Sequence, residues 1–216
     1  ELSPDLELKI LQVGAGPGDR PDSIHVVMET SRGPIEAMFQ PVEGGTGAVI
    51  CVGGAMPGPE KWSAESIPGQ LFDVLRPAGV SVLRLNYRIY NEFEECVLDT
   101  LAGVSFLRGI GAENIVLLGH SFGGAVVIKA GELAQGVVGV VSLSSQLHGT
   151  RQVERLGKPL LLIHGMSDTV LSHEASEDIY RRALPPRRLV LFADAGHTLR
   201  EVRSEILDIL RDWIPA

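Results

Sequence analysis

Short apolar runs alternate with longer segments of helical spacing along most of the chain. The runs are rich in Val, Ile and Leu and are shorter than a typical helix, so we predict strands there; they cover residues 48–52, 80–85, 115–118, 137–143, 160–163 and 189–192. The segments between them have the apolar spacing of amphipathic helices; they cover residues 67–77, 93–108, 122–135, 172–184 and 199–213. This alternation predicts a mostly parallel sheet with helices on both faces.

The first 45 residues follow a different pattern. Residues 25–31 and 34–42 are joined by the turn-like pair Arg32-Gly33, which is typical of an antiparallel hairpin. Residues 1–24 are expected to form an irregular N-terminal extension. The sequence contains no internal repeat and no linker, so we predict one domain over residues 1–216. The predicted fold class is α/β, with a twisted, mostly parallel sheet and an N-terminal antiparallel hairpin.

Composition and charge exclude several classes of protein. The chain has 216 residues, of which 44% are hydrophobic, and a domain of this size buries roughly 70% of its unfolded surface. Lys and Arg number 19 against 27 for Asp and Glu, which gives a net charge of −8. This sign is wrong for binding a phosphate backbone, so we expect no nucleic-acid partner. Residues 133–150, the longest stretch without charged side chains, are too polar to span a membrane.

The two cysteines indicate neither a disulfide framework nor a metal site. Cys51 lies in a predicted strand and Cys96 in a predicted helix, without a CxxC pair or metal-ligand spacing. No cofactor is expected. The low cysteine content favours the cytoplasm, although the chain begins at Glu1 without a methionine and a removed signal peptide is compatible with the sequence. We expect a monomer or a small homo-oligomer.

The most informative segment is residues 119–123, which reads Gly-His-Ser-Phe-Gly between a predicted strand and a predicted helix. In this context Gly-x-Ser-x-Gly marks a turn that holds a serine in a strained, exposed position. Side chains two residues before or after Ser121 would collide in so tight a turn. The following helix directs its first amides to the place where a bound carbonyl oxygen would become negative. Ser121 is therefore the candidate nucleophile; the alternative is a glycine-rich bend without a chemical role.

A serine nucleophile needs a base that takes its proton and an acid that orients the base. Asp168 lies on the loop after one predicted strand, and His197 follows the next predicted strand. Asp194, three residues before His197, competes for the role of the acid. We prefer Asp168 because a loop after the neighbouring strand reaches the far side of the imidazole, whereas a residue on the same turn usually does not.

From about residue 26 to residue 213 the chain resembles a small α/β-hydrolase. Three motifs carry the resemblance: Gly-His-Ser-Phe-Gly-Gly, His-Gly-Met-Ser-Asp and Ala-Gly-His, with the serine, acid and histidine in the chain order of that family. The resemblance implies that Ser121 is the nucleophile, that His197 is the general base and then the acid, and that Asp168 holds the imidazole.

The other five histidines are interpreted as structural. His120 is expected to point away from its neighbour Ser121, and His164 ends a predicted buried strand. The remaining three are expected at the surface or in loops; they are His25, His148 and His173.

An oxyanion hole needs two backbone N–H donors. Phe122 is expected to supply one of them. Many members of the family resemble His-Gly-x after the first parallel strand, but this chain has Gly53-Gly54 there. Ala55 would therefore supply the second donor, with Met56 as the runner-up; the alternative is an ordinary glycine-rich turn.

Only residues 144–159 separate two predicted strands at the position where larger family members carry a helical cap, so we expect no cap domain. The resemblance is therefore to compact, lidless hydrolases similar to dienelactone hydrolase, with a serine in place of the cysteine of that enzyme type. Arg88 has two interpretations of equal weight: its side chain reaches into the site, or it caps the end of a strand. The substrate pocket is expected to be open and apolar, and its candidate residues are Met56, Trp62, Tyr90, Leu147 and Val170.

These expectations predict an esterase that acts on a small uncharged ester through an acyl-enzyme on Ser121. The fold and the triad fix the class of chemistry rather than the leaving group. Amide, thioester or lactone hydrolysis and acyl transfer by the same triad therefore stay open. A non-catalytic ligand-binding member of the fold is the alternative from a different class, and a fluorophosphonate that reacts with Ser121 would separate the two.

Overall fold

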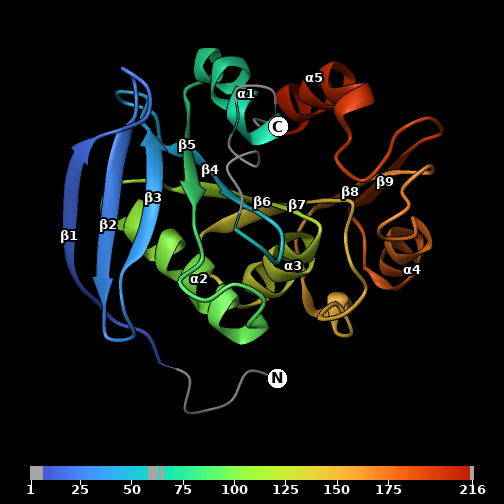
Figure 1. Ribbon diagram of the computed structural model, residues 1–216, viewed down its shortest axis with the longest axis horizontal. Coiled ribbons are helices and arrows are strands. Elements are labelled where there is room, and N and C mark those ends of the chain that lie inside the picture. Colours follow the sequence, from blue (N-terminus) through green and yellow to red (C-terminus); the bar gives the residue numbers. More distant parts are fainter. Residues whose placement is uncertain (1–6, 58–62, 64–65, 215–216) are drawn as a thin grey trace.

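A computed structural model of the chain describes residues 7–57, 63 and 66–214. Its strands form one nine-stranded sheet in the order β1-β2-β3-β5-β4-β6-β7-β8-β9 (Figure 1). The strands are β1 (Ile10–Pro17), β2 (Ile24–Thr30), β3 (Ile35–Gln40), β4 (Gly47–Val52), β5 (Val80–Leu85), β6 (Asn114–His120), β7 (Val137–Leu143), β8 (Leu160–Gly165) and β9 (Arg187–Phe192).

Helices connect the parallel strands. The α-helices are α1 (Ile67–Leu75), α2 (Phe93–Gly109), α3 (Phe122–Leu133), α4 (Glu174–Arg182) and α5 (Arg203–Trp213), and the short 3-10 helices are η2 (Arg76–Ala78), η3 (Val153–Arg155) and η4 (Arg200–Val202). β1, β2, β3 and β5 pair antiparallel, and the strands from β5 to β9 pair parallel. The predicted α/β class, with an antiparallel start and a parallel remainder, is confirmed.

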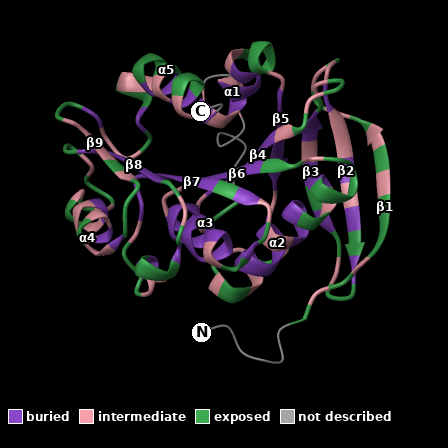
Figure 2. Cartoon of the chain, turned by 180° about the vertical axis from the view of Figure 1, so that it is seen from behind, coloured by how far each residue is buried: buried purple, intermediate pink, exposed green. Residues whose placement is uncertain are grey.

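The sheet separates two layers of helices, each with its own core. α1 and α5 lie on one face and α2, α3 and α4 on the other (Figure 1). Because successive side chains of a strand point to opposite faces, Ile50 and Val52 of β4 join the α2/α3 core while Val49 and Cys51 join the α1/α5 core. Figure 2 shows the central strands buried between these layers.

The start of the chain differs from the irregular extension expected over residues 1–24. Ile10–Pro17 forms β1, which pairs antiparallel with β2 at the edge of the sheet. Gly14, Gly16 and Pro17 are depleted in strands, so the sequence hides this element. An edge strand tolerates them because its hydrogen bonds to β2 fix the backbone, and the proline comes last in the strand.

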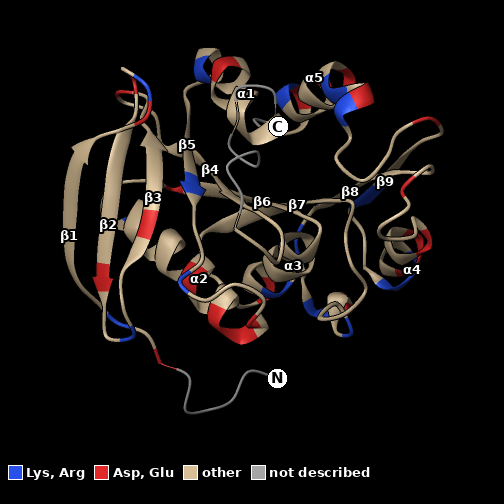
Figure 3. Cartoon of the chain, viewed as in Figure 1, with Lys and Arg blue, Asp and Glu red and all other residues tan. Residues whose placement is uncertain are grey.

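Charged side chains form local pairs around the sheet. Acidic and basic residues occur together on α2, α4 and α5 (Figure 3). Buried Arg84 donates to Asp19 at 2.8 Å, and Arg88 donates to Glu95 at 2.7 Å and pairs with buried Asp99. Arg88 therefore ties the end of β5 to α2, which is the second of the two roles considered for it.

The described part of the chain contains no helix long and apolar enough to cross a membrane. It also contains no group of three or more His, Cys, Asp or Glu side chains placed to hold a metal ion. The ends of β4, β6, β8 and β9 carry the loops with the candidate residues. In open parallel sheets, sites form at this carboxyl edge.

Candidate active site

Ser121 occupies the turn between β6 and α3 in a conformation that side chains seldom adopt, with φ 61° and ψ −118°. Its own amide donates to the Leu143 carbonyl at 2.8 Å, and its carbonyl accepts from the amides of Gly124 at 3.0 Å and Gln146 at 3.3 Å. Backbone strain of this kind persists only where surrounding contacts fix it. The end of β7 and the first turn of α3 supply those contacts.

The two glycines that flank Ser121 are required by close backbone approaches. A Cβ on Gly119 would lie 2.0 Å from the Gly123 carbonyl oxygen, and a Cβ on Gly123 would lie 2.4 Å from the Gly53 carbonyl oxygen. Any side chain at either position would therefore displace the backbone. The second approach also brings the loop after β4 against the start of α3, where an oxyanion hole is expected.

The structure brings together the three residues that the sequence singled out. His197 Nε2 lies 3.1 Å from Ser121 Oγ, and His197 Nδ1 lies 2.7 Å from Asp168 Oδ2. Because an ionised carboxylate only accepts hydrogen bonds, Nδ1 carries the hydrogen and the Nε2 lone pair faces the serine hydroxyl. The Asp168 side chain is fully buried and that of His197 is 18% exposed. Asp194, the competing acid, is exposed.

Asp168 is held as an anion by directed hydrogen bonds. Its Oδ1 accepts from the amides of Val170 at 2.8 Å and Leu171 at 2.9 Å. Burial acts to raise the pKa of Asp168, but the bonds from Leu171, His197 and Val170 outweigh it and lower the pKa below the usual range. A carboxylate that stays ionised favours positive charge on the imidazole beside it.

His120 contacts the site in a way that the sequence did not predict. Its ring packs against that of His197, with centroids 4.9 Å apart. Its Nε2 lies 2.8 Å from the His197 carbonyl oxygen, so Nε2 carries the hydrogen and donates it. Burial lowers the pKa of His120 to about 4, which keeps the ring neutral near pH 7. No sequence pattern marks this contact, because it joins the end of β6 to the loop after β9, which is far away in the chain.

The loop after β4 borders Ser121. A Cβ on Gly54 would lie 3.9 Å from the Cβ of Ser121, and the Tyr87 hydroxyl donates to the Gly53 carbonyl at 3.3 Å. Ala55 is half-buried against the core, whereas Met56 is 78% exposed. Phe122 begins α3, so its amide has no partner within the helix. Both expected donor segments therefore lie beside Ser121.

The candidate pocket residues lie in different surroundings. Val170, next but one to Asp168, and Leu147, next to Gln146, are exposed. Tyr90 is half-buried, with its ring 5.7 Å from that of Tyr87. Trp62 lies outside the described residues.

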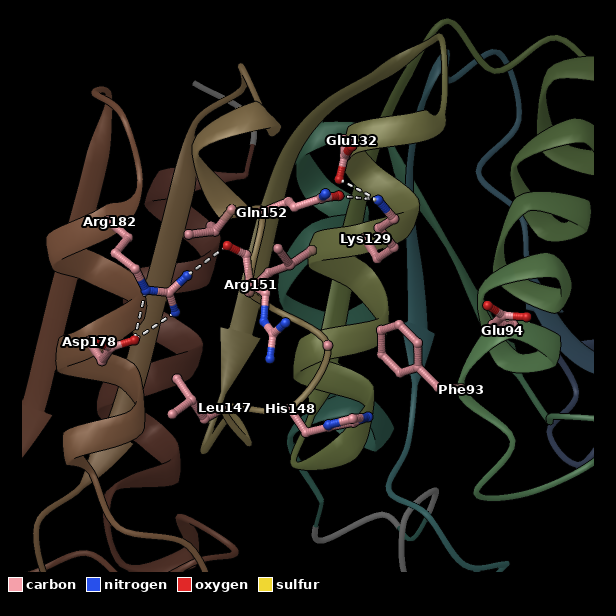
Figure 4. A pocket seen from close by; sticks show the side chains of 13 residues that line it. Phe93, Glu94, Lys129, Glu132, Leu147, His148, Arg151, Gln152, Asp178 and Arg182 are labelled. Carbon is pink, nitrogen blue, oxygen red and sulfur yellow. Dashed lines mark hydrogen bonds and ion pairs between the residues drawn. The ribbon is translucent and has the colours of Figure 1, made fainter. Parts of the chain in front are cut away.

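A groove of about 900 Å³ runs between α2, α3, α4 and the loop before η3 (Figure 4). Leu147 lines it, but Ser121 and the other two members of the hydrogen-bonded chain do not. Its lining includes two ion pairs, Lys129 with Glu132 at 2.9 Å and Arg182 with Asp178 at 2.6 Å. The groove is thus a neighbour of the site rather than the site itself.

No family model matches the sequence. The uncharacterised protein YfhR of Escherichia coli O157:H7 is 28% identical over a stretch that covers 46% of this chain and 44% of YfhR, less than half of that relative's length.

Solved structures resemble the chain over most of its length. Est1E from Butyrivibrio proteoclasticus is 16% identical with a TM-score of 0.75, covering 88% of this chain and 96% of its own. The Pyrococcus furiosus esterase Pf2001 is 20% identical with a TM-score of 0.73, covering 89% and 93%. An α/β serine hydrolase homologue from Coxiella burnetii is 20% identical with a TM-score of 0.72, covering 87% and 95%. The chain therefore has the α/β-hydrolase fold.

Proposed function

We propose that this chain is a serine hydrolase that cleaves small uncharged carboxylic esters. The observation that carries the proposal is the continuous hydrogen-bonded chain from Ser121 Oγ through the His197 ring to the Asp168 carboxylate. A serine in a strained turn, an imidazole beside its hydroxyl and a buried carboxylate that orients the imidazole are the groups that acyl transfer requires. The likeness to proteins described as an esterase and a serine hydrolase agrees with this reading.

In the acylation step, Ser121 Oγ attacks the ester carbonyl carbon while His197 Nε2 takes the hydroxyl proton. The carbonyl oxygen becomes negative in the tetrahedral intermediate. The amides of Phe122 and Ala55, with Met56 as the alternative second donor, would stabilise that charge. His197 then gives its proton to the departing alkoxide oxygen, the carbon–oxygen bond breaks, and an alcohol leaves.

Deacylation repeats these steps with water. His197 Nε2 takes a proton from a water molecule, whose oxygen attacks the acyl carbon. When the tetrahedral intermediate collapses, the bond to Ser121 Oγ breaks and His197 returns the proton to that oxygen. The products are a carboxylic acid and free enzyme. Asp168 stabilises the imidazolium that forms in both steps and does not itself take up the proton.

The surroundings of the triad support an uncharged substrate. The exposed side chains of Met56, Leu147 and Val170 lie in loops that contact or flank the triad, and all three are apolar. Arg88 is held by Glu95 and Asp99 and is therefore not available to bind a substrate carboxylate. An open, apolar approach suits an ester without charge, which we propose as the substrate class.

A series of p-nitrophenyl esters from acetate to decanoate tests this function. We expect a burst of nitrophenol release followed by a slower steady rate, because the acyl-enzyme accumulates. The dependence of kcat/KM on chain length would then measure the acyl site. If no ester turns over while the matching thioesters, amides or lactones do, the proposed triad is retained and the assignment of esters as the substrate class is wrong. If none turns over, a ligand-binding role on this fold replaces the proposal.

A further inference from the structure

The Asp168 carboxylate has a second histidine beside it. His164 Nε2 lies 3.1 Å from Asp168 Oδ2, the same oxygen that lies 2.7 Å from His197 Nδ1. The side chains of His164 and Asp168 are both fully buried. His164 is the penultimate residue of β8, so the sheet fixes its backbone. Two imidazoles from separate segments thus converge on one carboxylate oxygen.

The partners of the His164 ring identify the nitrogen that carries its hydrogen. Nε2 faces the Asp168 carboxylate and also the Leu171 carbonyl oxygen at 3.1 Å, and both groups only accept. Nε2 therefore donates. Nδ1 lies 2.7 Å from the hydroxyl of buried Ser176 on α4, which donates to the Nδ1 lone pair. Burial lowers the pKa of His164, so the ring is neutral near pH 7.

These contacts complete the hydrogen bonding of a carboxylate that solvent does not reach. The amides of Val170 and Leu171 donate to Oδ1, and His197 and His164 donate to Oδ2. An ionised carboxylate offers about four acceptor sites, so all of them are occupied. Without His164, one acceptor site of buried Asp168 would be unsatisfied, and a contact that resists rotation of the carboxylate would be lost.

We propose that His164 is a positioning residue for the triad, which holds the Asp168 carboxylate in the orientation that His197 needs, with Ser176 fixing the tautomer of the His164 ring. This inference rests on the proposed function. A neutral donor suits the task because it orients Oδ2 without placing a second positive charge beside the imidazolium that forms during the reaction. A lysine or arginine there would oppose that charge.

The hydrogen bond from His164 also tunes the electrostatics. His164 donates to the same oxygen of Asp168 that attracts protonated His197. This hydrogen bond partly neutralises the negative charge on that oxygen and thereby weakens the attraction. Loss of the donor makes the carboxylate the stronger partner of the imidazolium, so activity should fall off at a higher pH on the acid side. The other titratable groups that face this network are His120, packed on the His197 ring, and Glu201, beside the His197 loop; they are the same in wild type and variants.

Two substitutions test the proposal. His164→Leu removes the donor, whereas His164→Gln places an N–H near the position of Nε2. We expect His164→Leu to lower kcat about 10- to 100-fold, with little change in KM. The acid midpoint of its kcat profile should move to higher pH. His164→Gln should regain most of the rate and the wild-type midpoint.

His25→Gln is the matched control, because His25 lies on β2 and its nearest charged partner is Glu36 at 3.6 Å. It should change neither the rate nor the midpoint. The proposal is overturned if folded His164→Leu keeps the wild-type kcat and midpoint. It is also overturned if His164→Gln, with a wild-type melting temperature, is as slow as His164→Leu, because a donor at that position would then contribute nothing to the reaction.

A measurement on the wild-type protein needs no turnover and stands even if His164→Leu does not fold. Nitrogen–proton correlation spectra of the imidazole side chains near pH 7 should show His164 neutral, with its hydrogen on Nε2. A hydrogen on Nδ1 alone, or a charged ring, overturns the proposal. The proposed function can fail while this network is present. If His164 shows the expected tautomer but the protein neither turns over esters nor reacts with a fluorophosphonate at Ser121, the hydrogen-bond network is confirmed and the proposed function is rejected. The two failures are therefore distinguishable.

Discussion

Asp99 and Asp168 both have side chains without exposure to solvent, yet they are held by different partners. Asp99, in α2, pairs with the guanidinium of Arg88, a group that stays protonated in proteins. Asp168, after β8, is held by two amides and two imidazoles. One carboxylate meets a fixed positive charge, and the other meets two backbone amides and two imidazoles.

The pKa values of the two groups follow this difference. Burial raises the pKa of Asp99, and its bonds to Arg88 offset this only in part. Burial acts on Asp168 too, but its hydrogen bonds lower the pKa overall. The first carboxylate ties β5 to α2 and stabilises the fold. In the proposed mechanism, the second keeps a negative charge available for a positive charge that forms only during the reaction. Burial alone therefore does not distinguish a structural acid such as Asp99 from the proposed catalytic acid Asp168; the chemical nature of the hydrogen-bonding partners does.

The largest effect is expected from Asp168→Asn. Asparagine keeps the size of the side chain but not its charge, and its amide group can hold the His197 ring in the wrong tautomer. We expect kcat to fall about 10⁴-fold, with circular dichroism unchanged. Initial rates on the best p-nitrophenyl ester measure this. A loss of less than tenfold would mean that Asp168 is no more catalytic than Asp99.

Asp99→Asn should lower the stability of the fold and leave the activity unchanged, the opposite of the result expected for Asp168→Asn. It leaves buried Arg88 with one charged partner, Glu95, and should lower the free energy of unfolding by about 2 kcal/mol. The kcat per folded molecule should stay close to wild type. Urea denaturation and active-site titration give the two quantities. A fall in kcat comparable to that of Asp168→Asn would place Asp99 in the chemistry and end the comparison.

His120→Gln should change how stability depends on pH. The ordinary pKa of a histidine is 6.5, and that of His120 is lowered to about 4. Between these values the unfolded chain binds a proton that the folded chain does not, so the free energy of unfolding falls as the pH falls. Glutamine can still donate to the His197 carbonyl but does not titrate. The variant should therefore lose less stability than wild type from pH 6.5 to pH 4, as followed by melting temperature; equal slopes would exclude a neutral His120.

The smallest effect is expected from Asp194→Asn. Asp194 is exposed and lies three residues before His197 in the chain. Its removal should leave kcat/KM and the melting temperature near their wild-type values, because surface charges contribute little. The assay is the one used for Asp168→Asn. A loss as large as that of Asp168→Asn would transfer the role of the acid to Asp194.

Much of the fold and of the candidate site followed from the sequence. Buried parallel strands are continuous apolar runs, and Val80–Leu85 and Val137–Leu143 have the predicted bounds. The serine turn was recognisable because its glycines are required sterically. β1 was missed because its glycines and proline hide an edge strand that pairing alone defines.

The supporting contacts of the site could not be predicted. His120 reaches the His197 carbonyl only because the end of β6 and the loop after β9 meet in space. His164 and Asp168 are four residues apart, and they meet because the loop after β8 folds back on the end of that strand. Hydrophobic periodicity and motifs predict the course of the backbone, but they do not predict which group a histidine side chain contacts. The residues proposed to line the substrate pocket share this difficulty, since they lie in different loops.

A fluorophosphonate with a mass-resolvable tag tests the central claim most directly. The intact wild-type protein should gain one adduct, and peptide mapping should place it on Ser121, because only an activated serine attacks the phosphorus at a useful rate. Ser121→Ala should gain none, and Asp168→Asn should react much more slowly. No adduct on folded wild-type protein, or an adduct on another residue, would contradict the assignment of Ser121 as the nucleophile.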